Sequence, residues 1–470
     1  MKTKQARLHK VRFMRAPIYL LSFSLGLPFF FFIKAVPDER YDPSTLVFPA
    51  FLHTYGVRKA TAKHLFLYMQ NRVKVSNPQG IAATRLEVWD DPKDSKDDDE
   101  ITVYGVNSGQ NAVIYNTSMT AIAVYGLYEK NERRLNRPHG ITAHRSGEVY
   151  LADTGNNRVV HFFNPGRELK WVRALGGMAA PRDVAISADR TVYVADTGNN
   201  RVLVFQHDQL LQTWDQAGQF FSPAGIAATD STEQWSYYKD SFVVVNDQDG
   251  QRLQKFSRSG RLLKTVNAAA LGKANVKFMY LAIDYYSNVF VTDFNNHCVH
   301  KFDRDLNYLT SFGRRGDGDK EFLEPRGISI YKRFGQVLID DRESAQYYWI
   351  GVDALNCRAA LHSPPRLLQI DYFLTETAYV TAEILDANGA VLARPLNKTL
   401  RFAGPQQEFL SGQWEPVAAS VENNRRRYDP RLLLNLPAVP SGKYVLRLTF
   451  SATYSSYKYF SKTVELGAEL

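Results

Sequence analysis

The stretch Ala152–Val159 reads ADTGNNRV, and the same eight letters return at Ala195–Val202. A short run of alternating apolar residues precedes each copy and another follows it, which is the pattern of two strands joined by a polar turn. One further short apolar run lies upstream of each copy, after a proline, and one lies downstream. Four short strands in roughly 45 residues are the composition of one β-propeller blade.

Weaker copies of the same unit surround these two. Each copy has an Asp or Asn after an apolar run, and these anchors are Asn107, Asp153, Asp196, Asp247, Asp293 and Asp341. Successive anchors are 46, 43, 51, 46 and 48 residues apart. The sequence therefore predicts an all-β fold with a closed propeller of six blades over about residues 50–360. The segment 51–75, with alternating residues at 64–68, is predicted to supply the strand that closes the ring against the sixth blade.

The repeat resembles the NHL repeat in two motifs, Pro-x-Gly-Ile at 138–141 and Val-Tyr-x-Ala-Asp-Thr-Gly-Asn-Asn-Arg-Val at 149–159. The resemblance implies an NHL-type six-bladed propeller. In each turn we expect the Asp to accept backbone N–H groups and to pair with the Arg five positions later. We expect the Gly to supply a positive φ, with Asn tolerating the left-handed region beside it. The residues expected to hold these turns are Asp153, Asn156, Arg158, Asp196, Asn199, Arg201, Asp247, Arg252 and Asp293.

The N-terminus carries an export pattern. Six basic residues and no acid lie in residues 1–15, and residues 16–33 are uncharged. This order predicts either a cleaved signal peptide or a retained membrane anchor over residues 1–35. The rest of the chain is then expected outside the cytoplasm, in the periplasm, in the cell envelope or secreted. The net charge is +10, but residues 1–35 carry seven of these charges, so the remaining +3 gives no reason to expect nucleic-acid binding.

The C-terminal part follows a different pattern. Ser363-Pro364-Pro365 predicts a linker, and residues 366–470 contain alternating runs with an Asn388-Gly389 hairpin signal. They predict a small β-sandwich of immunoglobulin-like type, weakly similar to a domain of flagellar hook-capping proteins, and that similarity carries no site residues. Cys298 and Cys357 are assigned to the fifth and sixth blades; two buried free thiols and a disulfide both remain open.

The residue between Pro and Gly on each innermost strand is expected at the mouth of the central channel. Read around the ring, these residues are Gln79, His139, Arg182, Ala224, Met279 and Arg326. In the peptide-amidating lyase branch of NHL propellers, histidines at such positions hold a catalytic zinc, and here only His139 matches. A catalytic zinc needs three protein ligands, so we expect no metal and no cofactor.

Donors at this mouth favour an anionic ligand. We take Gln79, His139, Arg182 and Arg326 as candidate ligand-binding residues, because Arg and His make charge-assisted hydrogen bonds to carboxylates. The alternative is structural, since Arg182 could pair with the adjacent Asp183. Elsewhere, Cys298 and His300 would share one face of a strand, but two ligands without a third indicate a structural role.

Three classes of function are considered, and the third, nucleic-acid binding through one basic face as in some cytoplasmic NHL propellers, is disfavoured because an export pattern is present and the rest of the chain is not strongly basic. The first is an exported, non-catalytic binding or scaffold protein that recognises a protein, peptide or glycan through its propeller faces. The membrane is a further partner if the N-terminal segment is retained, and no nucleic-acid partner is expected. The alternative is a propeller enzyme, either a metal-dependent lyase or a lactonase-like hydrolase, with its site at the channel mouth. The residue set favours the non-enzymatic class because it lacks a general base and a complete metal shell.

Overall fold

The computed structural model of the chain describes residues 43–50, 58–90, 101–118, 121–363, 366–422 and 425–469. The predicted signal or anchor at residues 1–35 lies outside these residues. Within the described ranges, no helix is both long and apolar enough to cross a bilayer.

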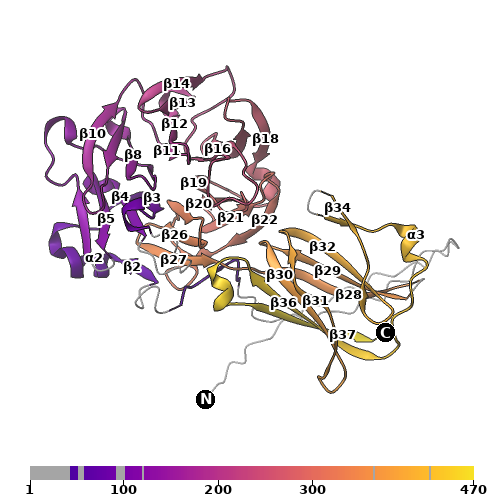
Figure 1. The fold of residues 1–470 in the computed structure, drawn as a ribbon. Helices are drawn as coiled ribbons and strands as arrows, with labels where there is room; N and C mark the ends of the chain where they lie inside the picture. The colour runs from indigo at the N-terminus through magenta and orange to yellow at the C-terminus, as the bar shows by residue number, and fades with distance from the viewer. Residues whose placement is uncertain are drawn as a thin grey trace, which may run out of the picture.

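The described residues form an all-β fold in which antiparallel sheets are arranged as propeller blades (Figure 1). The first three sheets are β3 (Pro78–Thr84), β4 (Thr102–Asn107), β5 (Ala112–Ser118) and β6 (Ala121–Tyr125); β7 (Ile141–Ala143), β8 (Glu148–Asp153), β9 (Arg158–Phe163) and β10 (Lys170–Leu175); and β11 (Asp183–Ile186), β12 (Thr191–Asp196), β13 (Arg201–Gln206) and β14 (Gln209–Trp214).

The next three sheets follow the same order. They are β15 (Ile226–Thr229), β16 (Phe242–Asp247), β17 (Arg252–Phe256) and β18 (Leu262–Asn267); β19 (Phe278–Ile283), β20 (Val289–Asp293), β21 (Cys298–Phe302) and β22 (Tyr308–Phe312); and β25 (Ile328–Tyr331), β26 (Gln336–Asp340) and β27 (Ser344–Ile350). The innermost strands contact one another in the order β3, β7, β11, β15, β19 and β25, and β25 contacts β3. The second strands are buried on both faces because neighbouring blades cover them, which explains runs such as Val192-Tyr193-Val194.

The sixth blade is completed from the N-terminal side. Two short strands, β1 (Leu46–Val47) and β2 (Lys59–Thr61), pair with its outer strand β27. The segment 51–75 thus supplies a closing strand as predicted, at β2, but the alternating residues 64–68 do not form it, because they lie in the helix α2 (Ala62–Met69). Thr61 caps the N-terminus of this helix, and its backbone N–H donates to His64 Nδ1 at 3.2 Å. Five alternating residues were too few to outweigh this local capping and the helix-forming Ala, Lys, Leu and Met.

The repeated turns are built around buried carboxylates. Asp153 Oδ2 accepts a hydrogen bond from Arg158 Nε at 2.7 Å, and Asp196 and Arg201 pair at the same distance. The positive φ falls on the second Asn of each turn, 54° at Asn157, and not on the Gly as expected. Gly155 is needed for another reason: a Cβ there would lie 2.6 Å from Asn136 Cγ in the chain entering the blade.

A second unit consists of two four-stranded sheets packed on a shared core. One sheet contains β28 (Ala354–His362), β29 (Leu367–Leu374), β32 (Gly404–Ser411) and β33 (Glu415–Pro416), and the other contains β31 (Val391–Arg401), β30 (Ala378–Leu385), β36 (Lys443–Ala452) and β37 (Lys462–Glu469). Leu368 and Ile370 of the first pack with Leu446 and Leu448 of the second. Its immunoglobulin-like type stays a prediction.

The remaining elements are short. They are α3 (Pro430–Leu433), the parallel pair β23 (Arg314–Arg315) and β24 (Glu321–Phe322), and the hairpin β34 (Ser420–Glu422) and β35 (Arg425–Arg427).

The boundary between the two units differs from the predicted one. Strand β28 pairs with β29, so residues 354–362 belong to the second unit and not to a propeller ending near residue 360. Cys357 consequently lies in the second unit, not in the sixth blade. Cys298 and Cys357 are both buried and unbonded.

The two units contact each other through buried polar and aromatic groups. Lys301 of β21 forms an ion pair with Glu376, and both side chains are almost inaccessible to solvent. Asn288 Nδ2 also donates to Glu376, at 3.4 Å. The ring of Tyr454 from the second unit lies edge-on to Tyr286 with centroids 6.0 Å apart. A buried ion pair of this kind fixes one docking geometry, because displacing it would leave charges unpaired.

Candidate functional site

A cavity of about 480 Å³ opens at one mouth of the ring, and all six predicted inner-strand positions line it: Gln79, His139, Arg182, Ala224, Met279 and Arg326. The repeated register explains why they meet. In successive blades the backbone N–H at this position donates to a carbonyl of the second strand, as in His139 to Ala152 at 2.9 Å and Arg182 to Ala195 at 3.0 Å. The same register at equivalent positions directs these residues to one mouth.

Arg182 is the unpaired cation of this cavity. Among the described residues its guanidinium has no carboxylate within ion-pair distance and no hydrogen-bond acceptor. The expected alternative, a pair with Asp183, does not form: Asp183 instead accepts backbone N–H groups from Val184 and Ile226, each at 2.9 Å. Arg182 therefore retains its capacity to bind an anion.

Arg326 differs from Arg182 because it is held by protein groups. Its Nη1 donates to Asn77 Oδ1 at 2.5 Å and to the Pro78 carbonyl at 2.8 Å. Glu324 forms an ion pair with it at 3.4 Å, and the guanidinium lies 5.4 Å from the centroid of the Phe294 ring. With 9% of its surface exposed, Arg326 is mainly a wall of the cavity.

His139 is neutral and has a fixed tautomer. The hydroxyl of Thr154 donates to the Pro181 carbonyl at 2.6 Å, so the contacts of His139 Nδ1 with Thr154 Oγ1 and the Arg137 carbonyl, both 2.9 Å, require Nδ1 to be the donor. The unprotonated nitrogen is then Nε2. Burial, followed by the positive charge of Arg182, lowers the pKa of His139 to about 3.

Gln79 forms part of the buried side of the cavity. Its Nε2 donates to Asn77 Oδ1 at 3.1 Å, and its Oε1 accepts from Tyr280 at 3.3 Å. Gln79 is 5% exposed. Of the four predicted ligand-binding residues, Gln79 and Arg326 are thus bound to the protein, whereas Arg182 and His139 offer a free donor and a free acceptor.

Sequence reasoning missed the outer residues of this cavity. Thr197 and Phe294 lie one position after the anchors Asp196 and Asp293, and Asp249 lies two positions after another anchor. The position after the anchor was therefore a usable signal in the third and fifth blades. Lys277 also lines the cavity, and its Nζ lies 3.3 Å from Asp249 Oδ1.

The titration of His139 gives a prediction for stability. Its folded-state pKa lies below the ordinary value, so the unfolded chain binds more protons between about pH 6.5 and 3. The contribution of His139 to the free energy of unfolding is therefore present above pH 6.5 and decreases as the pH falls. We expect urea midpoints measured at pH 7 and pH 4.5 to differ less for His139→Gln than for the unmodified protein. The same difference between the two pH values in both proteins would contradict a lowered pKa of His139.

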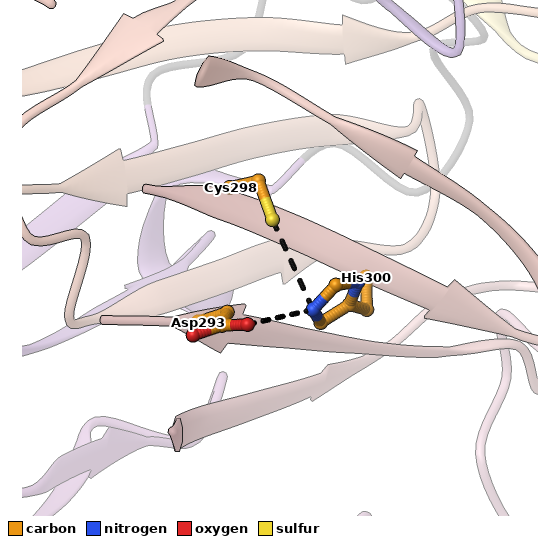
Figure 2. A group of neighbouring side chains, drawn as sticks. All are labelled: Asp293, Cys298 and His300. Carbon is orange, nitrogen blue, oxygen red and sulfur yellow. Dashed lines mark hydrogen bonds and ion pairs between the residues drawn. The ribbon is translucent and has the colours of Figure 1, made fainter. Parts of the chain in front are cut away.

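A second group of potential ligands lies inside the fifth blade (Figure 2). Asp293, Cys298 and His300 are buried, and one ligand atom from each lies within 4.8 Å of the others. His300 Nε2 is 2.9 Å from Asp293 Oδ2 and 3.8 Å from Cys298 Sγ. The sequence predicts that Cys298 and His300 share one face of a strand, but it identifies Asp293 only as a turn residue. In the structure Asp293 of β20 pairs directly with Cys298 of β21. These three atom types are ones that zinc accepts.

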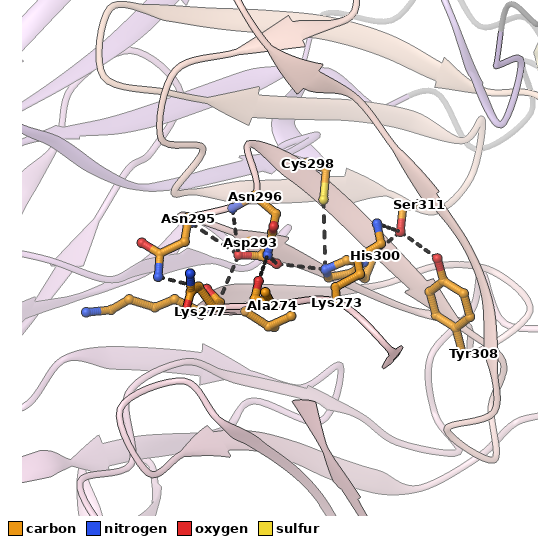
Figure 3. A network of polar contacts seen from close by, with 12 residues as sticks. Lys273, Ala274, Lys277, Asp293, Asn295, Asn296, Cys298, His300, Tyr308 and Ser311 are labelled. Atoms are coloured by element: carbon orange, nitrogen blue, oxygen red, sulfur yellow. Dashed lines mark hydrogen bonds and ion pairs between the residues drawn. The ribbon is translucent and has the colours of Figure 1, made fainter. Parts of the chain in front are cut away.

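Hydrogen bonds satisfy this group without an ion (Figure 3). Lys273 Nζ donates to Ser311 Oγ at 2.9 Å, Ser311 donates to His300 Nδ1 at 2.8 Å, and His300 Nε2 donates to Asp293. Burial raises the pKa of the Cys298 thiol to about 12, so it is not a thiolate. Both Asp293 and Cys298 meet the same nitrogen, so His300 cannot pass a proton between them as in a catalytic triad.

The repeat accounts for the group. Cys298 stands five positions after its anchor, where the second, third and fourth blades have the Arg that pairs with the carboxylate. His300, two positions further on the same strand face, makes that contact instead. The cluster is the fifth blade's version of the Asp–Arg pair.

Comparison with known proteins agrees with this repeat. The NHL repeat family matches residues 135–162 and 179–205, which lie in the second and third blades. The chain carries NHL repeats and has a β-propeller fold. A stretch of 120 residues is 24% identical to Protein brain tumor of Drosophila melanogaster, covering 24% of this chain and only 12% of that protein.

Two solved structures are similar at low identity. A virginiamycin B lyase from Staphylococcus aureus, in its catalytically inactive H270A form with quinupristin, is 13% identical and has a TM-score of 0.40, covering 53% of this chain and 76% of its own. A gluconolactonase from Xanthomonas campestris is 13% identical with a TM-score of 0.43, covering 68% of this chain and 99% of its own.

Proposed function

We propose that this protein is an extracytoplasmic binding protein that recognises a protein, peptide or glycan partner at the channel mouth, through a carboxylate or similar anion that it does not turn over. The observation that carries the proposal is the unpaired guanidinium of Arg182 in a cavity of about 480 Å³. A charge-assisted hydrogen bond to an anion would satisfy this donor.

The other residues of the cavity fit the same ligand. Neutral His139 offers Nε2 as an acceptor for an N–H group of the ligand, such as a peptide N–H next to the carboxylate, and Phe294 and Met279 provide apolar parts of the cavity wall. An anion attached to an apolar group, such as the terminal carboxylate of a peptide with an apolar last side chain, matches this combination. The carboxylate of Asp249, in the outer part of the cavity, is paired with Lys277 Nζ at 3.3 Å, and three metal ligands are not found together among the described residues of this cavity, which favours binding over turnover.

Replacing Arg182 by Ala tests the proposal. The probe is a pool of random peptides with free C-terminal carboxylates, compared with the same pool amidated. We expect the unmodified protein to retain the free-acid pool preferentially, and Arg182→Ala to weaken this retention about tenfold to a hundredfold, because a hydrogen bond to a charged group contributes about 1.5–3 kcal/mol.

Arg261→Ala is the matched control, since Arg261 is an exposed arginine on a loop outside the cavity. It should leave retention unchanged. Equal retention by the Arg182→Ala variant and the unmodified protein would overturn the proposal. Stoichiometric zinc, with an activity lost on chelation, would replace it by the enzymatic alternative.

A further inference from the structure

Helix α2 exposes two large apolar side chains on its outward face, where a soluble protein is expected to be polar. Its half-buried residues are His64, Leu65 and Met69, so positions 63, 66, 67 and 70 face away from the propeller. Of these, Phe66 is 51% exposed and Leu67 is 75% exposed, and Lys63 lies on the same face one turn before Leu67. Two adjacent exposed apolar side chains with a basic residue beside them indicate a contact surface.

The stretch of chain that contains the helix carries charge of one sign. Exposed basic residues lie before, within and after the helix, and residues 58–86 contain no Asp or Glu: the exposed basic residues are Arg58, Lys63, Arg72 and Lys74. Arg and Lys beside exposed Phe, Leu and Tyr are the composition of helices that lie on anionic bilayers. The same charges would not favour a basic partner.

The position of α2 is suited to a membrane contact. Helix α2 follows β2, which pairs with the outer strand of the sixth blade, and β1 pairs with the same strand. On β27, Lys59 of β2 pairs with Gln346, and Leu46 of β1 pairs with Ile350. Gln346 and Ile350 are four residues apart, which is about 13 Å along the strand. β1, near the start of the described residues, therefore lies on the same edge of the propeller as β2, which α2 follows; Figure 1 shows α2 and β2 near β27.

We propose that α2 is a membrane-surface helix, which inserts Phe66 and Leu67 into the headgroup region of an anionic phospholipid bilayer while the four basic residues contact the headgroups. The helix then fixes how the propeller is oriented on the membrane. This inference does not rest on anion binding at the channel mouth and stands or falls separately from it.

A spin label at residue 67 tests the proposal in the full chain. Leu67→Cys can be labelled selectively because Cys298 and Cys357 are buried and their thiol pKa values are raised to about 12. The control is Leu211→Cys in β14, also an exposed leucine, at 56%, on the blade across the ring. Each protein is reconstituted in vesicles containing phosphatidylglycerol, and collision of the label with oxygen and with a water-soluble nickel chelate is measured.

We expect the label at 67 to lose nickel accessibility severalfold and to gain oxygen accessibility, while the label at 211 remains accessible to nickel. Replacing Arg58, Lys63, Arg72 and Lys74 by Gln should restore nickel accessibility at 67. The proposal is overturned if residue 67 stays as nickel-accessible as residue 211. It is also overturned if residue 67 is shielded from both reagents without vesicles, since a second copy or another segment then covers the helix.

Discussion

Replacing Glu376 by Ala is expected to lower the free energy of unfolding by about 3–5 kcal/mol, because it leaves the ammonium of Lys301 buried without its partner. Lys301 and Glu376 are 1% and 0% exposed and come from different units of the chain. The backbone N–H of Thr377 donates to Glu376 at 2.7 Å, so the carboxylate has a fixed position. Urea unfolding, followed separately in each unit, measures the effect.

The control for this prediction is an exposed pair. Arg447 Nε and Glu465 Oε1 are 2.7 Å apart in the second unit, and Glu465 is half exposed. Glu465→Ala should change the urea midpoint little, since solvent already screens the pair. The double substitution of Lys301 by Met and Glu376 by Leu should recover part of the loss, because it removes the unpaired ammonium, although the buried carboxyl of Asp284 then loses the nearby positive charge of Lys301. A loss as large in this double variant as in Glu376→Ala would show that packing, not charge, is responsible.

The repeat made the channel mouth predictable. Because each blade has the same register, one position per repeat was enough to identify six residues that line one cavity, including His139 and Arg182. The turn pairs Asp153–Arg158 and Asp196–Arg201 follow from the same periodicity.

The repeat could not indicate which residues outside the motif contact each inner-strand position, because these residues differ from blade to blade. Arg182 and Arg326 occupy equivalent positions, yet Asn77 and Glu324 hold only the second. These partners come from segments before the inner strands, which the motif does not specify. The helix at α2 and the strand β28 were missed for a related reason, since both lie outside the repeated pattern, where short alternation alone does not distinguish helix from strand.

In the fifth blade we can test whether His300 takes the place of the arginine that pairs with the anchor carboxylate. We expect His300→Ala to lower the free energy of unfolding by about 2–4 kcal/mol, because it opens a cavity and removes hydrogen bonds from Asp293 and Ser311 at a fully buried site. Calorimetric unfolding of the variant beside the unmodified protein measures this loss.

The fourth blade supplies the design for restoring the site. There Arg252 stands five positions after Asp247, as Cys298 does after Asp293, and donates to Asp247 at 2.7 Å. Gln254 stands seven positions after Asp247, as His300 does after Asp293, and donates to Asp247 at 3.2 Å. In the fifth blade the Ala274 carbonyl accepts from Asn296 at 3.1 Å, as the Arg134 carbonyl of the second blade accepts from Asn156 at 2.9 Å. Arg158 also donates to that Arg134 carbonyl, at 3.0 Å, so an Arg introduced at 298 would find an equivalent acceptor.

The double substitution of Cys298 by Arg and His300 by Gln should therefore be much more stable than His300→Ala, since it recreates the carboxylate pair of the other blades. Each variant and the unmodified protein are unfolded with and without a chelator, and their zinc content is measured. If His300 only replaces the motif arginine, chelation leaves the unfolding temperature of the unmodified protein unchanged. A chelator-sensitive unfolding temperature with stoichiometric zinc, both lost in the double variant, would instead identify Asp293, Cys298 and His300 as metal ligands, because removing a bound metal removes its contribution to folding.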